Sequence, residues 1–271
     1  MNVSTISAVE PAELSSVRAL AYSNPDLHLP LCYRLAVAPR PEELVCYSLP
    51  EGAGVMISNG HEWVVALKQA NRKESLAAAA DALVALAQPG QQLTAVSSVA
   101  DTLAAAWTKA SRQRATLSEV CDYMVVRKSL ISRPDPDISA VQEKSAMSHQ
   151  QAVAEMAICW AATQREPVSL KAFEASLGNA DALLCRKLDM TTAFMVYTLL
   201  FPGSGQRRQH ILMGSCCGEP EQMSKLFARL VNMPCKVGAL VSRDNCRQQE
   251  KLVNAGFVQH RGLQFSTYDL C

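Results

Sequence analysis

The sequence of 271 residues lacks the features that mark several large classes of protein. It has no surplus of one charge, because 26 basic and 25 acidic residues leave a net charge of +1, whereas nucleic-acid binding normally needs a basic surplus on one face. No apolar run reaches the roughly 18 residues of a membrane-spanning helix. Segment 1–16 carries Glu10 and Glu13 and no apolar core, unlike a signal peptide. We therefore expect a cytoplasmic protein that binds neither nucleic acid nor membrane.

Paired cysteine motifs are also absent. The ten cysteines include no Cys-x-x-Cys pair and show no regular spacing, which argues against a structural zinc site and against a disulfide framework. We expect reduced thiols and no metal. Cys216 and Cys217 precede a predicted helix, whose N-terminus can lower a thiol pKa. A cysteine nucleophile paired with His210 is therefore an alternative to two small buried side chains.

What the sequence does contain indicates a folded protein built in two halves. It is 49% apolar and 19% charged, as globular proteins are, and its length allows two small domains. The segment Ser132–Asp137 contains two prolines and predicts a linker. We place one domain at 1–131, a linker at 132–147 and a second domain at 148–271. Both halves show hairpin, helix, strand, helix and strand signals in the same order, which hints at a duplication.

In the first half, the β-rich runs 54–58 and 61–68 flank Asn59-Gly60, the pair preferred in a tight type I′ hairpin turn. An alanine-rich helix is predicted over 75–87. A strand over 93–97, a helix that opens with a capping box at Ser98–Asp101, and a strand over 120–126 complete this half.

In the second half, the clearest helix begins after Ser148, whose hydroxyl can cap the first turn with Gln151 reaching back. Apolar periodicity then predicts strands over 182–188, 192–201 and 209–215, an amphipathic helix over 219–231, a strand over 236–241, a short helix over 245–254 and a final β region over 257–270.

The segment Val241–Asn245, followed by Asn254–Phe257, resembles the closing signature of the GNAT acyltransferase superfamily. There a strand ends in an asparagine, a short helix follows, and Gly-Phe opens the last strands; Gly256 stands eleven residues after Asn245. Asn245 or Asp244 can cap that helix, and Gly256 can end it in a left-handed conformation. The resemblance implies an α/β fold with a V-shaped, mixed and mostly antiparallel central sheet, flanking helices and a terminal hairpin, in a tandem of two related halves.

The resemblance also implies a function, the transfer of an acyl group from acetyl-CoA or another acyl-CoA to an amine of a small molecule or a protein. It implies that His210, Glu155 or Tyr268, with Tyr197 as a further candidate, supplies an acid or base. Each of these also has a structural interpretation, as a strand-edge residue, a solvated helix face, or core and rim aromatics. The residues that the resemblance places along the acyl donor are Leu212, Met213, Gly214, Ser215, Cys217, Gly218 and Asn245.

Two features depart from the family pattern. The phosphate-binding loop, Gln/Arg-x-x-Gly-x-Gly/Ala, keeps only Gly218, while Pro220 lacks an amide donor and two glutamates add negative charge. The tyrosine that often serves as general acid is replaced by Leu252. These departures keep a second function open, a non-catalytic GNAT-like scaffold for protein contacts or for sensing a small ligand.

Overall fold

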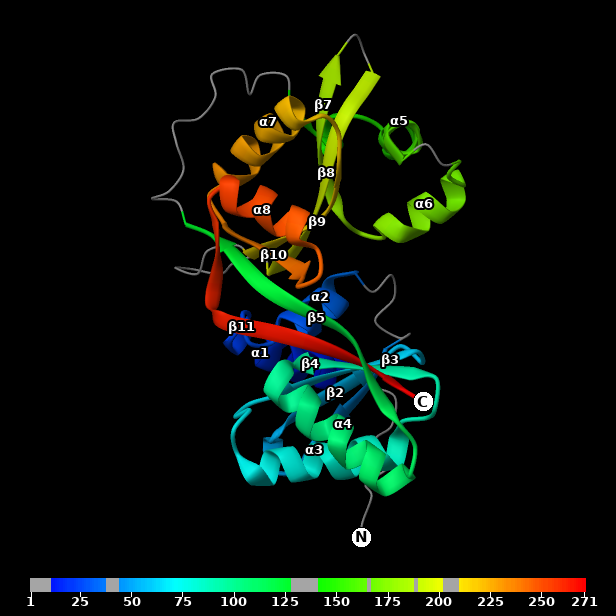
Figure 1. Cartoon of the computed structure of the whole chain (residues 1–271), viewed down its shortest axis with the longest axis vertical. Helices are drawn as coiled ribbons and strands as arrows, with labels where there is room; N and C mark the ends of the chain where they lie inside the picture. The colour runs from blue at the N-terminus through cyan, green and yellow to red at the C-terminus, as the bar shows by residue number, and fades with distance from the viewer. Residues whose placement is uncertain (1–10, 38–43, 128–140, 165–166, 188–189, 202–209) are drawn as a thin grey trace. The chain divides into compact units, whose positions relative to one another are not determined.

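The computed structural model describes residues 11–37, 44–127, 141–164, 167–187, 190–201 and 210–271 (Figure 1). The chain divides into two compact units. The first comprises Met1–Tyr123, Ser242–Asp244 and Arg261–Cys271, and the second comprises Met124–Val241 and Asn245–His260. The predicted linker at Ser132–Asp137 lies outside the described residues, so the domain limits at 131 and 147 remain predictions.

The first unit contains the predicted hairpin, helix, strand, helix and strand in that order, preceded by α1, α2 and β1, which were not predicted. Its helices are α1 (Pro11–Ser23), α2 (Leu29–Val37), α3 (Lys73–Leu86) and α4 (Ser97–Ser111), and its strands are β1 (Val45–Ser48), β2 (Gly54–Ser58), β3 (Glu62–Leu67), β4 (Gln91–Val96) and the first part of β5 (Ala115–Val126). Strands β1, β2 and β3 are antiparallel, and β4 lies parallel to β3. The end of β11 (Phe257–Leu270) pairs antiparallel with β4, from Phe265 opposite Val96 to Leu270 opposite Gln91.

Two local predictions in this unit need correction. The Asn59-Gly60 turn is longer than a two-residue type I′ turn, because the last paired residues are Ser58 and Trp63. Asn59 stabilises the longer turn by accepting hydrogen bonds from the amides of His61 at 3.1 Å and Glu62 at 2.9 Å. The predicted capping box at Ser98 is wrong, because α4 already begins at Ser97 and its N-cap residue, Val96, has no side-chain hydrogen bond.

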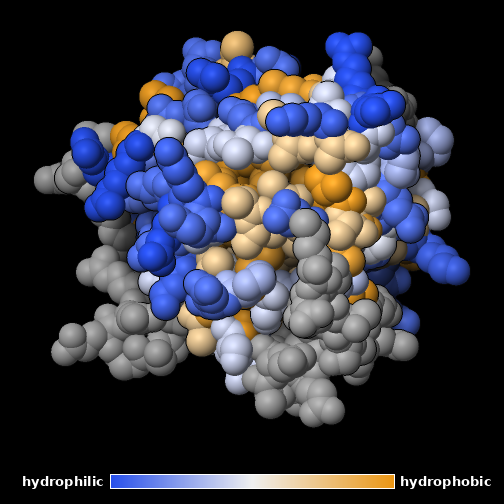
Figure 2. Space-filling model, turned by 90° about the horizontal axis from the view of Figure 1, so that it is seen from below, coloured by the Kyte–Doolittle hydropathy of each residue, from blue (hydrophilic) through white to orange (hydrophobic). Residues whose placement is uncertain are grey.

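The core of the first unit lies between the sheet and helices α3 and α4. Leu83, Leu93 and Leu103 are fully buried there, beside the nearly buried Trp63 and Trp107. Because α3 consists largely of alanine, it leaves small apolar side chains at the surface. Figure 2 views the unit from the side on which Figure 1 draws α3 and α4, and shows apolar residues gathered at the centre of this face, with hydrophilic residues on its left and right.

His28 joins the two N-terminal helices to the end of β3. Its ring is buried, with Nδ1 3.0 Å from the carbonyl oxygen of Leu20 and Nε2 3.0 Å from that of Leu67. These contacts hold the start of α2 against the residue at which β3 ends and the chain turns toward α3.

The second unit contains the elements predicted for the other half. Its helices are α5 (His149–Gln164), α6 (Leu170–Leu177), α7 (Pro220–Val231) and α8 (Cys246–Asn254), and its strands are β6 (Val141–Glu143), β7 (Asp181–Lys187), β8 (Met190–Phe201), β9 (His210–Cys217), β10 (Lys236–Ser242) and the first part of β11. Strands β7, β8 and β9 form an antiparallel meander, and β10 lies parallel to β9. At the start of α5, the Ser148 hydroxyl accepts a hydrogen bond from the Gln151 amide at 3.3 Å, as predicted, whereas the Gln151 side chain bonds Glu155 instead of reaching back.

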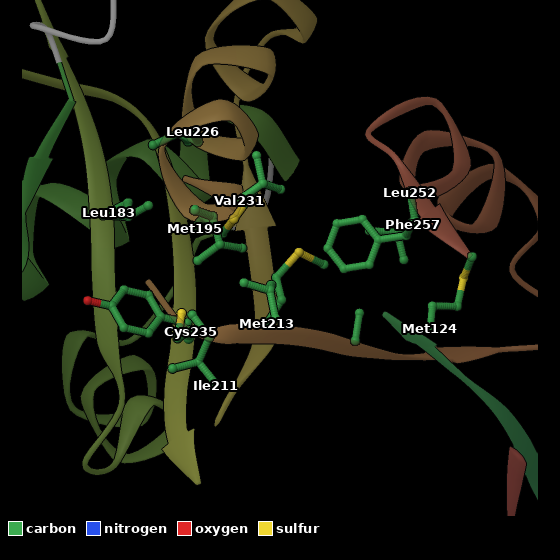
Figure 3. Close-up of a cluster of buried hydrophobic side chains, with 14 of the residues drawn as sticks. Met124, Leu183, Met195, Ile211, Met213, Leu226, Val231, Cys235, Leu252 and Phe257 are labelled. Carbon is green, nitrogen blue, oxygen red and sulfur yellow. The ribbon is translucent and has the colours of Figure 1, made fainter. Parts of the chain in front are cut away.

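Helices cover both faces of this sheet, and residues that alternate along each strand face them. Leu184, Phe194 and Val196 pack with α5 and α6 on one face. Leu183 and Met195 pack with Leu226 of α7 on the other, in the cluster that Figure 3 shows. A strand with apolar residues on both faces reads as a nearly continuous apolar run, which is how β7 and β8 read in the sequence.

The two units share one order of elements. In each, two helices precede three antiparallel strands, a helix leads to a strand parallel to the third, and a second helix leads to a long strand. The predicted α/β class with two related halves is therefore confirmed. The terminal hairpin is wrong, because β11 is one continuous strand. Positive φ angles of 51° at Arg261 and 68° at Gly262 interrupt it without reversing the chain.

Candidate functional site

The candidate site of the second unit is the place where β9 and β10 diverge. Their parallel pairing runs from His210 opposite Lys236 to Met213 opposite Ala239 and stops there. Both strands continue, β9 to Cys217 and β10 beyond Ala239. The sheet is therefore split on the C-terminal side of Met213, as the resemblance implied.

A β-bulge in β9 accounts for the split. On the side of β8, Met195 faces Cys216 and Tyr197 faces Met213, so Gly214 and Ser215 together stand opposite one residue, Val196. A bulge bends the strand and increases its twist, here at the residue where pairing with β10 ends. Gly214 and Ser215 are exposed although Met213 and Cys217 on either side are buried. The bulge thus opens the edge of β9 to solvent.

Gly218 follows the split strand in a conformation that only glycine adopts easily. Its φ is 140°, and a Cβ atom there would lie 2.2 Å from the Cβ of Ala193 and 2.9 Å from its Cα. The residue is therefore required by the close approach to β8 and by its backbone angle.

After Gly218, the side chains at the start of α7 hydrogen-bond to the backbone of the helix's own first turn. The Gln222 side chain accepts a hydrogen bond from the Glu219 amide at 3.4 Å, and the Glu219 side chain caps the first turn in return. Pro220 at the first helical position has no amide donor. A pyrophosphate would meet a Glu219 amide that is already hydrogen-bonded and a proline that has none, beside the carboxylates of Glu219 and Glu221. These residues do not fit a pyrophosphate.

Cys217 lies beside Cys159, a residue of α5. Its Sγ donates to the carbonyl oxygen of Cys159 on α5 at 3.7 Å, and both residues are buried. Hydrogen bonds from the Cys159 thiol and the Thr163 hydroxyl lower the Cys217 pKa against the effect of burial. His210 stands at the other end of the same strand, roughly 20 Å away at about 3.3 Å per residue. The alternative of a cysteine–histidine pair is therefore wrong.

His210 lies at the paired end of β9 and is 3% exposed. Tyr197 is buried in β8, and burial raises its pKa to about 12. Tyr268 belongs to the first unit, where its hydroxyl donates to Asp101 of α4 at 2.8 Å. His210 therefore stands at the end of β9 away from the split, whereas Tyr197 lies opposite Met213, where the split begins.

Glu155 lies on α5 in a polar cluster with β7 and β8. It pairs with the Arg186 guanidinium at 3.0 Å and accepts hydrogen bonds from the Thr191 hydroxyl at 2.7 Å and from the side-chain amide of Gln151 at 3.0 Å. Burial raises the Glu155 pKa, but these hydrogen bonds and the charge of Arg186 outweigh it and hold the pKa below its ordinary 4.5. A carboxylate with a lowered pKa is a weak base. Glu155 instead connects α5 to β7 and β8 through Arg186 and Thr191.

We expect Glu155→Gln to lower the free energy of unfolding at neutral pH by about 1–3 kcal/mol, because charge-assisted hydrogen bonds are lost. Since the folded pKa lies below the ordinary value of 4.5, this stabilisation is present above that pH and is lost as pH falls through the folded pKa. Urea unfolding of both proteins between pH 7 and pH 3 should show the difference shrinking in acid. A difference that grows in acid would contradict the assignment, and Glu250→Gln on the exposed face of α8 is the control.

Asn245 and Leu252 belong to α8, whose start and end match the predicted signature. The Asn245 side chain caps the helix by accepting from the Gln248 amide at 3.1 Å, and Gly256 follows the helix with a φ of 88°. Leu252, at the position of the family's tyrosine, is 1% exposed and points into the core beside Phe257 (Figure 3). Both residues therefore serve the fold of the helix.

Only the family resemblance pointed to the backbone at Gly214 and Ser215; the bulge itself was not predicted, because a bulge needs no particular side chain. Within the described ranges, no group of three His, Cys, Asp or Glu side chains could hold a metal ion. None of the helices there is long and apolar enough to span a membrane.

No family model matches the sequence, and no curated protein matches it. Solved structures match in fold. A Drosophila protein aligns over 97% of both chains with 14% identity and a TM-score of 0.58. A tandem GNAT protein from the clavulanic acid biosynthesis pathway covers 95% of this chain and 93% of its own, with 12% identity and a TM-score of 0.54. A GNAT-family acetyltransferase from Colwellia psychrerythraea covers 81% of both chains, with 11% identity and a TM-score of 0.51. The chain therefore has the fold of the GNAT acyltransferases.

Proposed function

We propose that the second unit transfers an acyl group from a thioester donor to an amine, as a cytoplasmic N-acyltransferase. The observation that carries the proposal is the split between β9 and β10 at the exposed bulge of Gly214 and Ser215. The edge of β9 that faces β10 has no paired strand beyond Met213. An extended amide-containing arm, such as that of an acyl-CoA, can hydrogen-bond to such an edge as an added strand does.

The second unit is suited to bind the amide-containing arm of acyl-CoA but not its pyrophosphate. Leu212, Met213, Gly214 and Ser215 supply backbone for the arm. The capped first turn of α7 and its glutamates oppose the pyrophosphate. We therefore expect the split to hold the thioester arm and to gain little from the nucleotide end of the donor.

The side chains around the split limit how fast acyl transfer can be. Neither His210 nor Glu155 is placed to take a proton there, and Leu252 cannot protonate a thiolate. Proton transfer would then pass through water, without the roughly 10²–10⁴-fold gain of a positioned acid or base. The amine acceptor, of a small molecule or a protein, would have to arrive as the neutral base.

The test is thermal unfolding of the full chain with acetyl-CoA and, separately, with acetylated pantetheine, which lacks the nucleotide. A donor present at a hundred times its Kd stabilises the protein by about 2.7 kcal/mol. We expect similar Kd values for the two donors. Glu221→Gln should tighten acetyl-CoA binding alone, because it removes a charge near the pyrophosphate, whereas Glu250→Gln should change neither.

A non-catalytic GNAT-fold module is the second candidate. The closed start of α7 and the buried leucine at the tyrosine position favour it. On this alternative the unit serves protein contacts or senses a small ligand. Neither donor would then stabilise the protein at millimolar concentration, and that result would end the acyltransferase proposal.

A further inference from the structure

Two buried thiols meet where the split strand of the second unit packs against a helix. Cys217 is the last residue of β9, and Cys159 approaches it from α5. The Cys217 Sγ lies 3.7 Å from the Cys159 carbonyl oxygen, and the Cys159 thiol hydrogen-bonds to the Cys217 sulfur. Cys159 is 6% exposed and Cys217 is 4% exposed, in the cluster between the sheet and helices α5 and α6. The pair therefore joins two elements at residues that are 58 positions apart in the sequence.

Cys217 is the more nucleophilic thiol of the pair. Hydrogen bonds from the Cys159 thiol and from the Thr163 hydroxyl lower the Cys217 pKa, although burial opposes them. The hydrogen bond to Cys217, together with burial, raises the Cys159 pKa. Because the thiolate is the reactive form of cysteine, the contact divides the pair into a nucleophile and a second thiol beside it. A cysteine of lowered pKa next to a resolving cysteine is typical of redox-sensitive proteins.

Three other cysteines show what burial does without such a neighbour effect. Burial is the largest influence on Cys32, Cys121 and Cys216, and it raises the pKa of each. Cys216 directly precedes Cys217 but packs with the cluster on the opposite face of the sheet, since successive side chains of a strand alternate between faces. Cys216 is therefore a control at almost the same point of the chain.

We propose that Cys217 and Cys159 form a reversible redox switch, in which hydrogen peroxide closes a disulfide that ties the end of β9 to α5. The Cys217 thiolate attacks one peroxide oxygen and becomes a sulfenic acid, and the hydroxide that leaves takes up a proton to form water. The Cys159 sulfur then attacks the sulfenic sulfur, and its proton leaves with the sulfenic hydroxyl as a second water. Two thiols are thus oxidised by two electrons while one peroxide is reduced. A dithiol reductant reverses the change.

The position of the pair limits the oxidant and determines what the disulfide changes. Cys217 and Cys159 are covered by the sheet and by α5, so peroxide, which is little larger than water, reaches them more readily than a bulky disulfide does. The bulge at Gly214 and Ser215 lies just before Cys217, and Gly218 directly follows it. A bond of about 2.05 Å between the two sulfurs would therefore fix one end of the open edge of β9. The switch does not depend on acyl transfer by this unit.

The test treats the full chain with hydrogen peroxide and maps its cysteines by peptide mass spectrometry. We expect the wild type to gain one pair of peptides joined through Cys159 and Cys217, and dithiothreitol should separate them again. Cys159→Ala should stop at the sulfenic acid of Cys217, which dimedone traps, whereas Cys217→Ala should yield neither product. Cys216→Ala, the matched control, should form the disulfide as the wild type does.

Two further measurements make the result decisive. Hydrogen exchange of the amides from Ser215 to Gly218 should slow in the oxidised wild type and not in peroxide-treated Cys159→Ala, since the disulfide restricts local opening. Disulfide formation should reach its maximal rate at a lower pH than alkylation of Cys216, because the pKa of Cys217 is lowered and that of Cys216 is raised.

Circular dichroism of the alanine variants, recorded before oxidation, shows whether they are folded, and the wild type with Cys216→Ala decides the result if they are not. The proposal would be overturned by the absence of a Cys159–Cys217 link in the oxidised wild type. A sulfenic acid on Cys159 in folded Cys217→Ala, or equal amide exchange in the reduced and oxidised wild type, would also overturn it.

Discussion

Replacing Gly218 by alanine is expected to lower the free energy of unfolding by about 2–6 kcal/mol, from backbone strain and overpacking together. The φ of 140° disfavours any side chain, and the added Cβ would lie 2.9 Å from the Cα of Ala193, a backbone atom that cannot turn aside. Relief would require β8 or the start of α7 to move. Chemical unfolding in urea measures the loss, which should appear as a lower midpoint with the same slope.

Gly214 is the matched control for this change. It lies four residues earlier, at the bulge, and an added Cβ would meet the carbonyl oxygen of Val196 at 3.5 Å, an ordinary contact. Gly214→Ala should therefore cost much less than Gly218→Ala. Equal losses at the two glycines would show that the constraint at Gly218 has been misjudged.

Replacing Leu252 by alanine is expected to cost about 2–5 kcal/mol, the usual range for a buried leucine. Leu252 is 1% exposed and packs in the cluster that also holds Met213 and Phe257 (Figure 3). A cavity there would loosen α8 from the sheet beside the split strand. Thermal and urea unfolding would both register the loss.

A substitution at the adjacent residue, Val253, distinguishes the loss of stability caused by a buried cavity from a change in helix stability. Val253 is 56% exposed on the same helix, so Val253→Ala should change stability by no more than about 0.5 kcal/mol. Leu252→Tyr should also destabilise, since a larger side chain would overpack the core. A stable Leu252→Tyr protein with faster acyl transfer would instead mean that this position faces the substrate.

Much of the fold could be predicted because strands and helices carry periodic signals. The strands β7 to β10 and the helices α7 and α8 lie within two residues of their predicted limits, and Asn245 caps α8 as expected. The turn at Asn59 and the start of α4 were misjudged, since local motifs such as Asn-Gly or Ser-x-x-Asp allow several geometries. Contacts with neighbouring strands then determine which of these geometries forms.

The candidate site was harder to predict than the fold. Residues such as Glu155, His210 and Tyr268 are of catalytic types, and chain position alone does not show that Glu155 is held by Arg186 or that Tyr268 bonds Asp101 in the first unit.

By itself, the sequence determined the α/β class, the two halves, the capping residues Ser148 and Asn245 and the absence of large charged or apolar stretches, because these depend on residues close in the chain. Tertiary structure alone decided that β9 and β10 part after Met213 and that the chain's last strand pairs with β4. Those features arise from pairing between distant segments, where backbone hydrogen bonds and packing, rather than side-chain type, select the partner.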